Sequence, residues 1–339
     1  MYEISYHPSN LSELSFLVTG GAGFIGSHIV EYFLRYGAKK VRVLDNFSTG
    51  FRRNIELFNA NSAFELVEGD IRDMEVCRKA VIGIDYVSHQ AALGSVPRSI
   101  NDPATTNAVN IDGFLNMLTA VRNESTVKRM VYAASSSTYG DSLELPKTEG
   151  KEGRPLSPYA VTKLVNELYA EVFSRVYGLH TIGLRYFNIF GPRQDPFGPY
   201  AAVIPLFIQA AIERKPPLIN GDGQTSRDFT FVENAVQANV KALLKTDNLE
   251  KHEAVNIACG ERISLNELWK EIGDLAGFDQ PAHYGAERLG DVRHSLADVS
   301  KANRLFGYNP ECKVATGLEK TFLAYKRELN PDIQNNPGK

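Results

Sequence analysis

A glycine-rich stretch near the start of the chain constrains the fold more than any other feature of the sequence. Residues 19–26 read TGGAGFIG and directly follow an apolar run at residues 16–18. The spacing fits two patterns, G-x-G-x-x-G through Gly21, Gly23 and Gly26, and G-x-x-G-x-x-G through Gly20, Gly23 and Gly26. Between a strand and a helix, either pattern is typical of a dinucleotide site, because glycines allow close approach to a pyrophosphate and the helix N-terminus supplies free N–H groups. The alternative is that the glycines serve only the turn.

An acidic residue at the end of the next predicted strand favours the dinucleotide interpretation. Asp45 stands in VRVLDNFSTG, downstream of the glycine cluster. A carboxylate at this place accepts hydrogen bonds from the adenosine ribose and would repel a 2′-phosphate, so the sequence predicts NAD rather than NADP. Arg52 and Arg53 are nearby but are expected to be solvated. Asp70 and Ile71, after the third predicted strand, are expected beside the adenine.

Short β-branched runs alternate with helix-length segments up to about residue 190. The predicted strands are residues 16–18, 41–45, 63–68, 86–90, 130–134 and 181–186. This alternation predicts an α/β fold of the Rossmann type, a doubly wound parallel sheet buried on both faces. Beyond residue 190 the loops are rich in Gly, Pro and Asp. Predicted helices in this part are residues 203–214, 232–244 and 264–276.

The sequence therefore predicts two regions of different character. Residues 14–190 form the NAD-binding Rossmann domain, and residues 191–328 form a smaller, mostly helical lobe that binds the substrate. The chain is free to cross back between them. Residues 329–339 are expected to form a flexible tail.

The charge balance and the cysteines exclude several classes of function. The 37 basic residues are matched by 40 acidic ones, for a net charge of −3, which argues against a nucleic-acid partner. No apolar run approaches the 18 or so residues of a membrane span, and no signal peptide is evident, so we expect a cytoplasmic protein. Cys77, Cys259 and Cys312 match no metal spacing; we expect buried thiols and no metal site.

A tyrosine and a lysine are the candidate catalytic pair. In SPYAVTK, Pro158 suits a helix start, and Tyr159 and Lys163 then lie at i and i+4 on one helix face. A lysine ammonium and the cationic nicotinamide would pull the pKa of the phenol, ordinarily near 10, toward the working range of a base. An exposed Tyr-Lys pair is the alternative. The serine run of AASSSTYG ends the fifth predicted strand, and such strand ends face the ligand crevice of a doubly wound sheet.

In this order, these motifs resemble those of the extended short-chain dehydrogenase/reductase family, and within it the nucleotide-sugar 4-epimerases. The matching stretches are TGGAGFIG, LDNFSTG, GDIRD, HQAALGSVPRS, AASSSTYGD, SPYAVTK, LRYFNIFGPRQDP, DGQTSRDF and RLGDVRHSLADVSKA. They span the chain from residue 16 to about 303. The sequence is most similar to epimerases that act on UDP-N-acetylglucosamine and UDP-N-acetylgalactosamine.

The resemblance implies a set of site residues. The catalytic residues would be Ser135, Tyr159 and Lys163, and the neighbouring Ser136 and Ser137 would contact the sugar or substitute in part for Ser135. The NAD contacts would be Gly20, Gly23, Phe24, Ile25, Gly26, Asp45, Asn46, Phe47, Ser48, Thr49, Gly50, Asp70, Ile71, Gln90, Ala91, Ala92, Asn110, Tyr159, Lys163 and Phe187. The UDP-sugar contacts would be Gly94, Ser95, Ser135, Ser136, Ser137, Tyr159, Asn188, Ala202, Val203, Asn220, Arg227, Arg288, Asp291 and Ser295. Arginine forks suit a pyrophosphate, although Arg227 and Arg288 in isolation would be interpreted as surface ion pairs.

Two departures from the galactose-type epimerases point to the substrate. Ser295 aligns where those enzymes can carry a tyrosine, and Gly94 replaces a lysine found in some relatives. Small residues at both positions would leave room for a 2-acetamido group, because a steric gate discriminates by clash. The alternative is that both residues only pack a loop.

The resemblance also implies the reaction and its rivals. The reaction would pass through a 4-keto sugar held by its UDP, with NAD retained between turnovers, and would feed surface polysaccharide synthesis. A 4,6-dehydratase would carry Asp-Glu where Ser136 and Ser137 stand, which disfavours it and leaves a decarboxylase as a lesser rival. Epimerases of UDP-glucose or of uronic-acid forms, and a non-catalytic NAD-binding sensor, remain alternatives. The family commonly forms a homodimer, here through helices near residues 108–121 and 159–176.

Overall fold

The sheet is parallel throughout and has seven strands, one more than the sequence predicted. The computed structural model describes residues 1–198, 200–245, 251–287 and 293–329. The strand order is β11-β6-β5-β4-β1-β2-β3. The strands are β1 Ser15–Thr19, β2 Lys40–Asp45, β3 Phe64–Glu68, β4 Tyr86–His89, β5 Arg129–Ser135, β6 Thr181–Tyr186 and β11 His252–Ile257. The order reverses between β1 and β4, and such a reversal is where doubly wound folds bind their ligands.

Helices cover both faces of this sheet, and alternate residues of β1 show the two cores. Phe16 and Val18 pack in one cluster with α1, α8 and α10, whereas Leu17 packs in the other with α2, α5 and α6. These helices are α1 Phe24–Arg35, α2 Met74–Val81, α5 Gly113–Asn123, α6 Pro158–Tyr177, α8 Val232–Leu244 and α10 Ser300–Phe306. The short helices α3 Val96–Asn101 and α4 Pro103–Asn107 lie beside α6.

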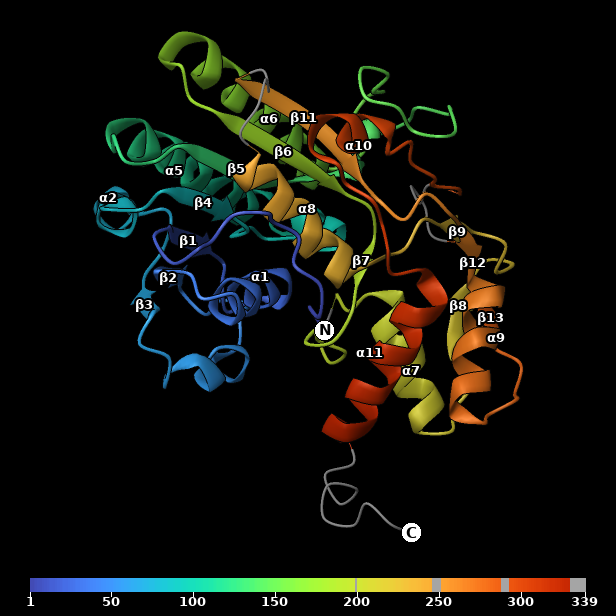
Figure 1. Cartoon of the computed structure of the whole chain (residues 1–339). Helices are drawn as coiled ribbons and strands as arrows, with labels where there is room; N and C mark the ends of the chain where they lie inside the picture. Colours follow the sequence, from blue (N-terminus) through green and yellow to red (C-terminus); the bar gives the residue numbers. More distant parts are fainter. Residues whose placement is uncertain (199, 246–250, 288–292, 330–339) are drawn as a thin grey trace.

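The remaining elements form the smaller lobe. Its helices are α7 Val203–Ile212, α9 Leu265–Ala276 and α11 Val314–Leu329, which lie together and apart from the sheet (Figure 1). Its strands are β7 Ile189–Phe190, β8 Leu218–Asn220, β9 Ser226–Arg227, β10 Thr230–Phe231, β12 Ile263–Ser264 and β13 His283–Gly285, joined in three two-stranded sheets. A separate apolar cluster containing Phe207, Trp269 and Leu318 forms the core of the lobe.

The two regions interleave along the chain. The sequence predicted the helix at residues 232–244 within the smaller lobe, but α8 packs on the sheet through residues such as Val236 and Val240. β11 then pairs with β6 in parallel. The sequence missed this strand because HEAVNI mixes His252, Glu253 and Asn256 with its apolar residues, as an edge strand does.

Three other expectations concern the rest of the chain. Cys77, Cys259 and Cys312 are free and buried, as predicted. None of the described helices is long and apolar enough to cross a membrane. The tail expected at residues 329–339 lies outside the described residues, except for Leu329, which ends α11.

Candidate active site

The turn between β1 and α1 is built so that only glycine fits at two of its positions. Gly20 has φ +67°, and a Cβ there would lie 2.7 Å from the backbone nitrogen of Ala91. A Cβ on Gly26 would lie 2.1 Å from the carbonyl oxygen of Gly20. Gly21 instead approaches the side chain of Val43 in β2. The pattern through Gly20, Gly23 and Gly26 is therefore the one that faces the crevice.

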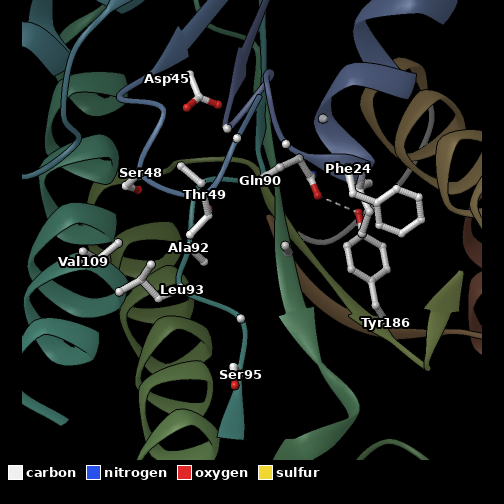
Figure 2. Close-up of a pocket in the computed structure, with 18 of the residues that line it drawn as sticks. Phe24, Asp45, Ser48, Thr49, Gln90, Ala92, Leu93, Ser95, Val109 and Tyr186 are labelled. Carbon is white, nitrogen blue, oxygen red and sulfur yellow. Dashed lines mark hydrogen bonds between the residues drawn. The ribbon is translucent and has the colours of Figure 1, made fainter. Parts of the chain in front are cut away.

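A cavity of about 610 Å³ lies above this turn, at the carboxyl ends of the strands. Of the residues expected to contact NAD, those that line it are Gly20, Gly23, Phe24, Ile25, Gly26, Asp45, Asn46, Ser48, Thr49, Gly50, Asp70, Ile71, Gln90, Ala91, Ala92, Tyr159 and Lys163. Figure 2 shows Asp45, Ser48 and Thr49 at one end of this cavity and Ser95 at the other. The glycine turn thus opens onto an elongated space that also reaches the Tyr-Lys pair.

The start of α1 leaves donors available to this cavity. Gly23 is the N-cap and has no side chain to bond the first-turn N–H groups, and Phe24 and Ile25 both line the cavity. The first turn contains no acidic residue. Free N–H groups and the positive end of the helix dipole suit an anion such as a pyrophosphate.

Asp45 closes the far end of the cavity. Its carboxylate is nearly buried and accepts the backbone N–H groups of Ala22 at 2.9 Å and of Phe47 at 2.8 Å. Burial raises its pKa, and these two hydrogen bonds oppose the rise. Arg52 and Arg53 are half-exposed and paired with Glu68 and Glu328, so neither lines the cavity.

Asp70 is more strongly engaged than the sequence suggested. Arg72 donates two hydrogen bonds to its carboxylate, and Asn46 donates a third at 2.8 Å. The bonds from Arg72 hold the pKa of Asp70 at about 2, well below its ordinary value. Asp70 is therefore a charged, fixed wall of the cavity next to Ile71.

Tyr159 and Lys163 lie in the first turns of α6, held in place by neighbouring elements. Ser157 caps the helix by accepting the N–H of Ala160, and Ser99 of α3 accepts the N–H of Tyr159 at 3.0 Å. The Lys163 ammonium lies 5.9 Å from the centre of the Tyr159 ring and donates to the carbonyl of Ala133 in β5 at 2.7 Å. Both side chains line the cavity, so the pair faces the crevice and not solvent.

The two groups respond differently to this environment. Burial lowers the pKa of Lys163 to about 8, against the opposing charge of Glu167. Burial raises the pKa of Tyr159, and the hydrogen bond with the Ser135 hydroxyl opposes the rise. The sequence predicted that Lys163 and the cationic nicotinamide together lower the pKa of Tyr159. The chain's own groups by themselves leave this pKa raised, because the loss of water around the phenol outweighs them.

The serine run divides into residues that face the cavity and one that lies behind it. Ser135 ends β5, and Ser135 and Ser136 line the cavity. Ser137 does not; its hydroxyl donates to the Ser135 oxygen at 2.9 Å, as does its backbone N–H at 3.1 Å. Ser137 thus orients the hydroxyl of Ser135.

Three residues expected to contact NAD lie outside this cavity lining. Phe47 lies under the guanidinium of Arg52. Asn110 is buried and bonds both backbone groups of Leu93, which supports the wall at that point. Phe187 is buried against Tyr139, behind the serine turn.

A second cavity, of about 670 Å³, lies in the smaller lobe and adjoins the first. Asn188, Ile189 and Gln194 line both cavities. The residues expected to contact a UDP-sugar that line the second one are Asn188, Ala202, Val203, Asn220 and Arg227. Arg288 and Asp291 lie outside the described residues.

The two positions expected to gate the sugar differ in their surroundings. Gly94 and Ser95 line the first cavity, and a Cβ on Gly94 would meet no atom within 4 Å. Ser295 lines neither cavity directly, but its hydroxyl lies 3.5 Å from the side-chain nitrogen of Asn188, which lines both. The space beside Gly94 is open, and Ser295 stands behind Asn188.

Sequence reasoning missed several residues of the cavity walls. Tyr186 lies at the end of β6 and donates to the side-chain oxygen of Gln90 at 3.1 Å, on the side of the cavity opposite Val109 and Leu93 (Figure 2). Arg193 and Gln194 line the first cavity as well. Arg193 and Gln194 belong to the stretch FGPRQDP, which the sequence already indicated to be a loop. Position at a strand end for Tyr186, and in the adjoining loop for the other two, is the signal that would have found these residues.

Comparisons with known proteins agree with this geometry. A putative UDP-glucose 4-epimerase of Methanocaldococcus jannaschii is 37% identical over 90% of this chain and 96% of its own. The UDP-N-acetylglucosamine 4-epimerase of Methanobrevibacter ruminantium, solved with UDP-N-acetylmuramic acid, superposes with a TM-score of 0.88 at 38% identity, over 94% of this chain and 99% of that one. The UDP-glucuronic acid 4-epimerase of Bacillus cereus, solved with UDP-glucuronic acid and NAD, superposes with a TM-score of 0.86 at 30% identity, over 93% and 100%.

The family profile covers the greater part of the chain. Residues 16–258 match the profile described as the NAD dependent epimerase/dehydratase family. The matched range contains the glycine turn, the Ser135–Tyr159–Lys163 group and Arg227, and stops at the end of the seventh sheet strand. The fold, the crevice and the relatives together establish that this chain belongs to the NAD dependent epimerase/dehydratase family, within the extended short-chain dehydrogenases/reductases.

Proposed function

We propose that this enzyme is a NAD-dependent 4-epimerase that interconverts UDP-N-acetylglucosamine and UDP-N-acetylgalactosamine through a 4-keto sugar. The observation that carries the proposal is the pair of adjoining cavities. One contains the glycine turn together with Ser135, Tyr159 and Lys163, and the other contains Arg227. The catalytic group stands in the first cavity, which meets the second at Asn188, Ile189 and Gln194.

The chain fits NAD at several independent points. The glycine turn provides a cradle that a Cβ at Gly20 or Gly26 would fill, and the uncapped start of α1 faces it. Asp45 is placed at the cavity end where an adenosine ribose would lie. When bound, NAD supplies the chemistry of taking a hydride from sugar C4 and returning it to the opposite face.

The side chains around the reacting oxygen move and hold the proton. Tyr159 takes the proton of the sugar 4-hydroxyl and later returns it, and Ser135, bonded to Tyr159, holds the same oxygen. Lys163 carries a positive charge at neutral pH, since its pKa is about 8, and this charge favours the phenolate over the phenol when Tyr159 gives up its proton. Lys163 would also hold the nicotinamide ribose, since its side chain lines the first cavity.

The smaller lobe retains the substrate while the sugar turns over. Arg227 and Asn220 line the second cavity, where they would bind the UDP group. A guanidinium offers several N–H donors to a pyrophosphate, so the nucleotide stays bound while the keto sugar rotates. Arg288 and Asp291 belong to the same proposal on the resemblance alone.

The N-acetylated sugars are favoured over two related substrates by the space near the sugar. Gly94 leaves open room on one side of the first cavity, and Ser295 is small where a tyrosine would reach toward Asn188. Epimerisation of UDP-glucose or of a uronic-acid form is the alternative, since named relatives act on these sugars. The product would serve surface polysaccharide synthesis.

A homodimer through α5 and α6 is part of the proposal. Val161, Leu168, Val172 and Val176 lie along α6 and are between 42% and 61% exposed. Their spacing places them on one stripe of the helix, and a second copy of the chain would cover it.

One experiment separates these possibilities. The purified protein is examined for bound NAD by its absorbance, and NMR follows UDP-N-acetylglucosamine, UDP-glucose and UDP-glucuronic acid incubated with it in parallel. Conversion of the N-acetylated sugar to its 4-epimer at the highest rate is expected. Faster conversion of either other sugar assigns the enzyme to that substrate, and NAD binding with no conversion of any sugar indicates a sensor.

A further inference from the structure

Asp228, between β9 and β10, is a fully buried carboxylate held by backbone donors alone. Its side chain is 0% exposed, and none of the described basic side chains forms an ion pair with it. It accepts the N–H groups of Cys259 at 3.0 Å, Gly260 at 3.2 Å and Ala297 at 3.2 Å. Burying a carboxylate is costly unless its oxygens accept hydrogen bonds. The three backbone N–H donors offset that cost and so hold the carboxylate in place.

These donors belong to two segments that are distant along the chain. Cys259 and Gly260 follow β11, the last strand of the large sheet. Ala297 belongs to residues 293–297, the described part of the stretch that also contains Arg288 and Asp291. Asp228 therefore fastens this segment to the end of the sheet.

The backbone of Asp228 contacts the residues next to the cavities. The side chain of Asn188 donates to the Asp228 carbonyl at 3.0 Å and lies 3.5 Å from the Ser295 hydroxyl. The N–H of Asp228 points at the same hydroxyl, also at 3.5 Å. Arg227, the preceding residue, lines the second cavity and donates to the carbonyl of Arg293 at 3.3 Å.

We propose that Asp228 is a positioning residue whose ionised carboxylate fixes the 293–297 segment, and with it the arrangement of Asn188, Arg227 and Ser295 that binds the sugar nucleotide. This rests on the proposed function, because it takes these three residues as the contacts of a UDP-sugar. Asp228 itself touches neither cavity and acts through its neighbours.

The ionisation of this carboxylate predicts the direction in which UDP-sugar affinity changes with pH. Burial raises its pKa to about 7, aided by the charge of Glu261 and opposed by the three backbone bonds; Cys259 and Tyr308 are the other titratable groups beside it, and burial raises the pKa of both. Above pH 7 the carboxylate accepts all three bonds. Below pH 7 its own proton opposes an N–H donor, so the segment loosens and UDP-sugar binding weakens.

The free energy of unfolding changes with pH in the opposite direction to UDP-sugar affinity. The predicted loss of affinity at low pH can therefore be distinguished from a general loss of stability. The folded pKa lies above the unfolded value of 3.8, so the folded chain takes up the proton more readily. The contribution of Asp228 to stability is therefore full below pH 3.8 and is lost as the pH rises through 7. A fall in UDP-sugar affinity between pH 8 and pH 6 cannot come from unfolding driven by this group.

The test measures the dissociation constant of UDP-N-acetylglucosamine by calorimetry, in a Tyr159→Phe background so that the ligand is not converted. The protein carrying Asp228 is expected to bind about tenfold more weakly at pH 6 than at pH 8. Asp228→Asn keeps the shape but leaves one oxygen to accept, so its binding is expected to be about tenfold weaker at pH 8 and flat with pH. In the catalytic background, the same substitution should raise KM and leave kcat within about threefold.

Two variants control for nearby groups. Asp222→Asn removes an exposed ion pair to Arg293 in the same segment and is expected to leave affinity within twofold. His294 belongs to the same segment and its ring is bonded to Ser226 at 2.8 Å; His294→Gln is expected to retain the pH dependence. Should Asp228→Asn fail to fold, the pH series of the chain with Asp228 intact still decides.

The outcomes distinguish this inference from the proposed function. Equal affinity at pH 6 and pH 8 with Asp228 in place, or an Asp228→Asn variant that binds within twofold of its parent, overturns the positioning role. Absence of any binding of UDP-N-acetylglucosamine, UDP-glucose or UDP-glucuronic acid in the parent protein overturns the proposed function instead.

Discussion

The hydroxyl of Tyr159 is the group on which the proposed chemistry depends most directly. Its pKa is raised by burial, while the Ser135 hydroxyl and the Lys163 charge are placed to favour its ionised form. A group that must give up and recover a proton within one turnover benefits from neighbours that limit this cost. At the scale of the residue, the pKa of Tyr159 is therefore set by two opposing effects: loss of water around the phenol, and the polar groups placed beside it.

Replacing Tyr159 by Phe should abolish most of the activity and leave the fold intact. We expect kcat to fall by about 10²- to 10⁴-fold, because general acid–base catalysis is lost, with bound NAD retained. Steady-state rates measure the first and absorbance of the purified protein the second. Tyr169→Phe, on the same helix and packed against the core between α6 and the sheet, is the matched control and should keep its activity. Near-normal epimerisation by Tyr159→Phe would contradict the assignment.

The size of residue 295 should decide between substrates. Ser295→Tyr is expected to lower kcat/KM for UDP-N-acetylglucosamine by about tenfold more than for UDP-glucose, because the ring would fill the space near Asn188. Parallel assays on the two sugars measure the ratio. Ser295→Ala keeps the residue small and should leave that ratio unchanged. An equal fall in kcat/KM for both sugars would contradict the steric explanation.

At the scale of the element, the conformation of the glycine turn depends on the absence of side chains at two positions. Gly20 approaches the backbone of Ala91 in the loop after β4, and Gly26 approaches the carbonyl of Gly20. Both contacts are with backbone, which cannot move aside as a flexible side chain does. The turn, the start of α1 and the strand end are thus fixed relative to one another.

Gly26→Ala should lose the cofactor. The added methyl would lie 2.1 Å from the Gly20 carbonyl oxygen, so the turn must shift, at a cost of about 1–3 kcal/mol in the free energy of unfolding. Thermal unfolding and the NAD content of the purified protein measure the two effects. Gly94→Ala adds the same methyl to the same cavity where no atom lies within 4 Å and should retain NAD. If both variants keep the cofactor equally, the close approach does not specify the turn.

At the scale of the whole molecule, the chain returns to the sheet after it has begun the smaller lobe. α8 carries Asn239, which is buried and donates to the Tyr186 hydroxyl at 2.7 Å while accepting from Ser88 and Gln90 at 3.1 Å. Tyr186 and Gln90 both line the first cavity. A helix from the second half of the sequence thus orients two side chains of the cofactor crevice.

The proposed dimer is a second property of the whole molecule. Light scattering coupled to size exclusion is expected to give twice the chain mass of 37.6 kDa. The double change Leu168→Glu and Val172→Glu should give the single-chain mass, because charges on the α6 stripe oppose its burial. Leu323→Glu places a charge on α11 at a similar exposure and should leave the dimer whole. A parent protein that elutes at 37.6 kDa contradicts the proposal.

Local patterns in the sequence were sufficient for the parallel sheet and its cofactor end. The six predicted strands are β1 to β6 within a residue or two. Strands such as β1 and β5 are buried apolar runs bounded by turns, as is typical of parallel sheets. The glycine turn, Asp45 and the Tyr159–Lys163 spacing are equally local. Most of the expected NAD contacts consequently line the first cavity.

Contacts between distant segments were decided only by the tertiary structure. The sequence gives no sign that α8 packs on the sheet, that β11 completes it, or that Ser137 lies behind Ser135 and Ser295 behind Asn188. The environment that raises the pKa of Tyr159 and of Asp228 likewise depends on what packs around each group. Short-range spacing fixes which residues share a turn or a helix face, whereas burial and proximity across the chain depend on how the elements pack together.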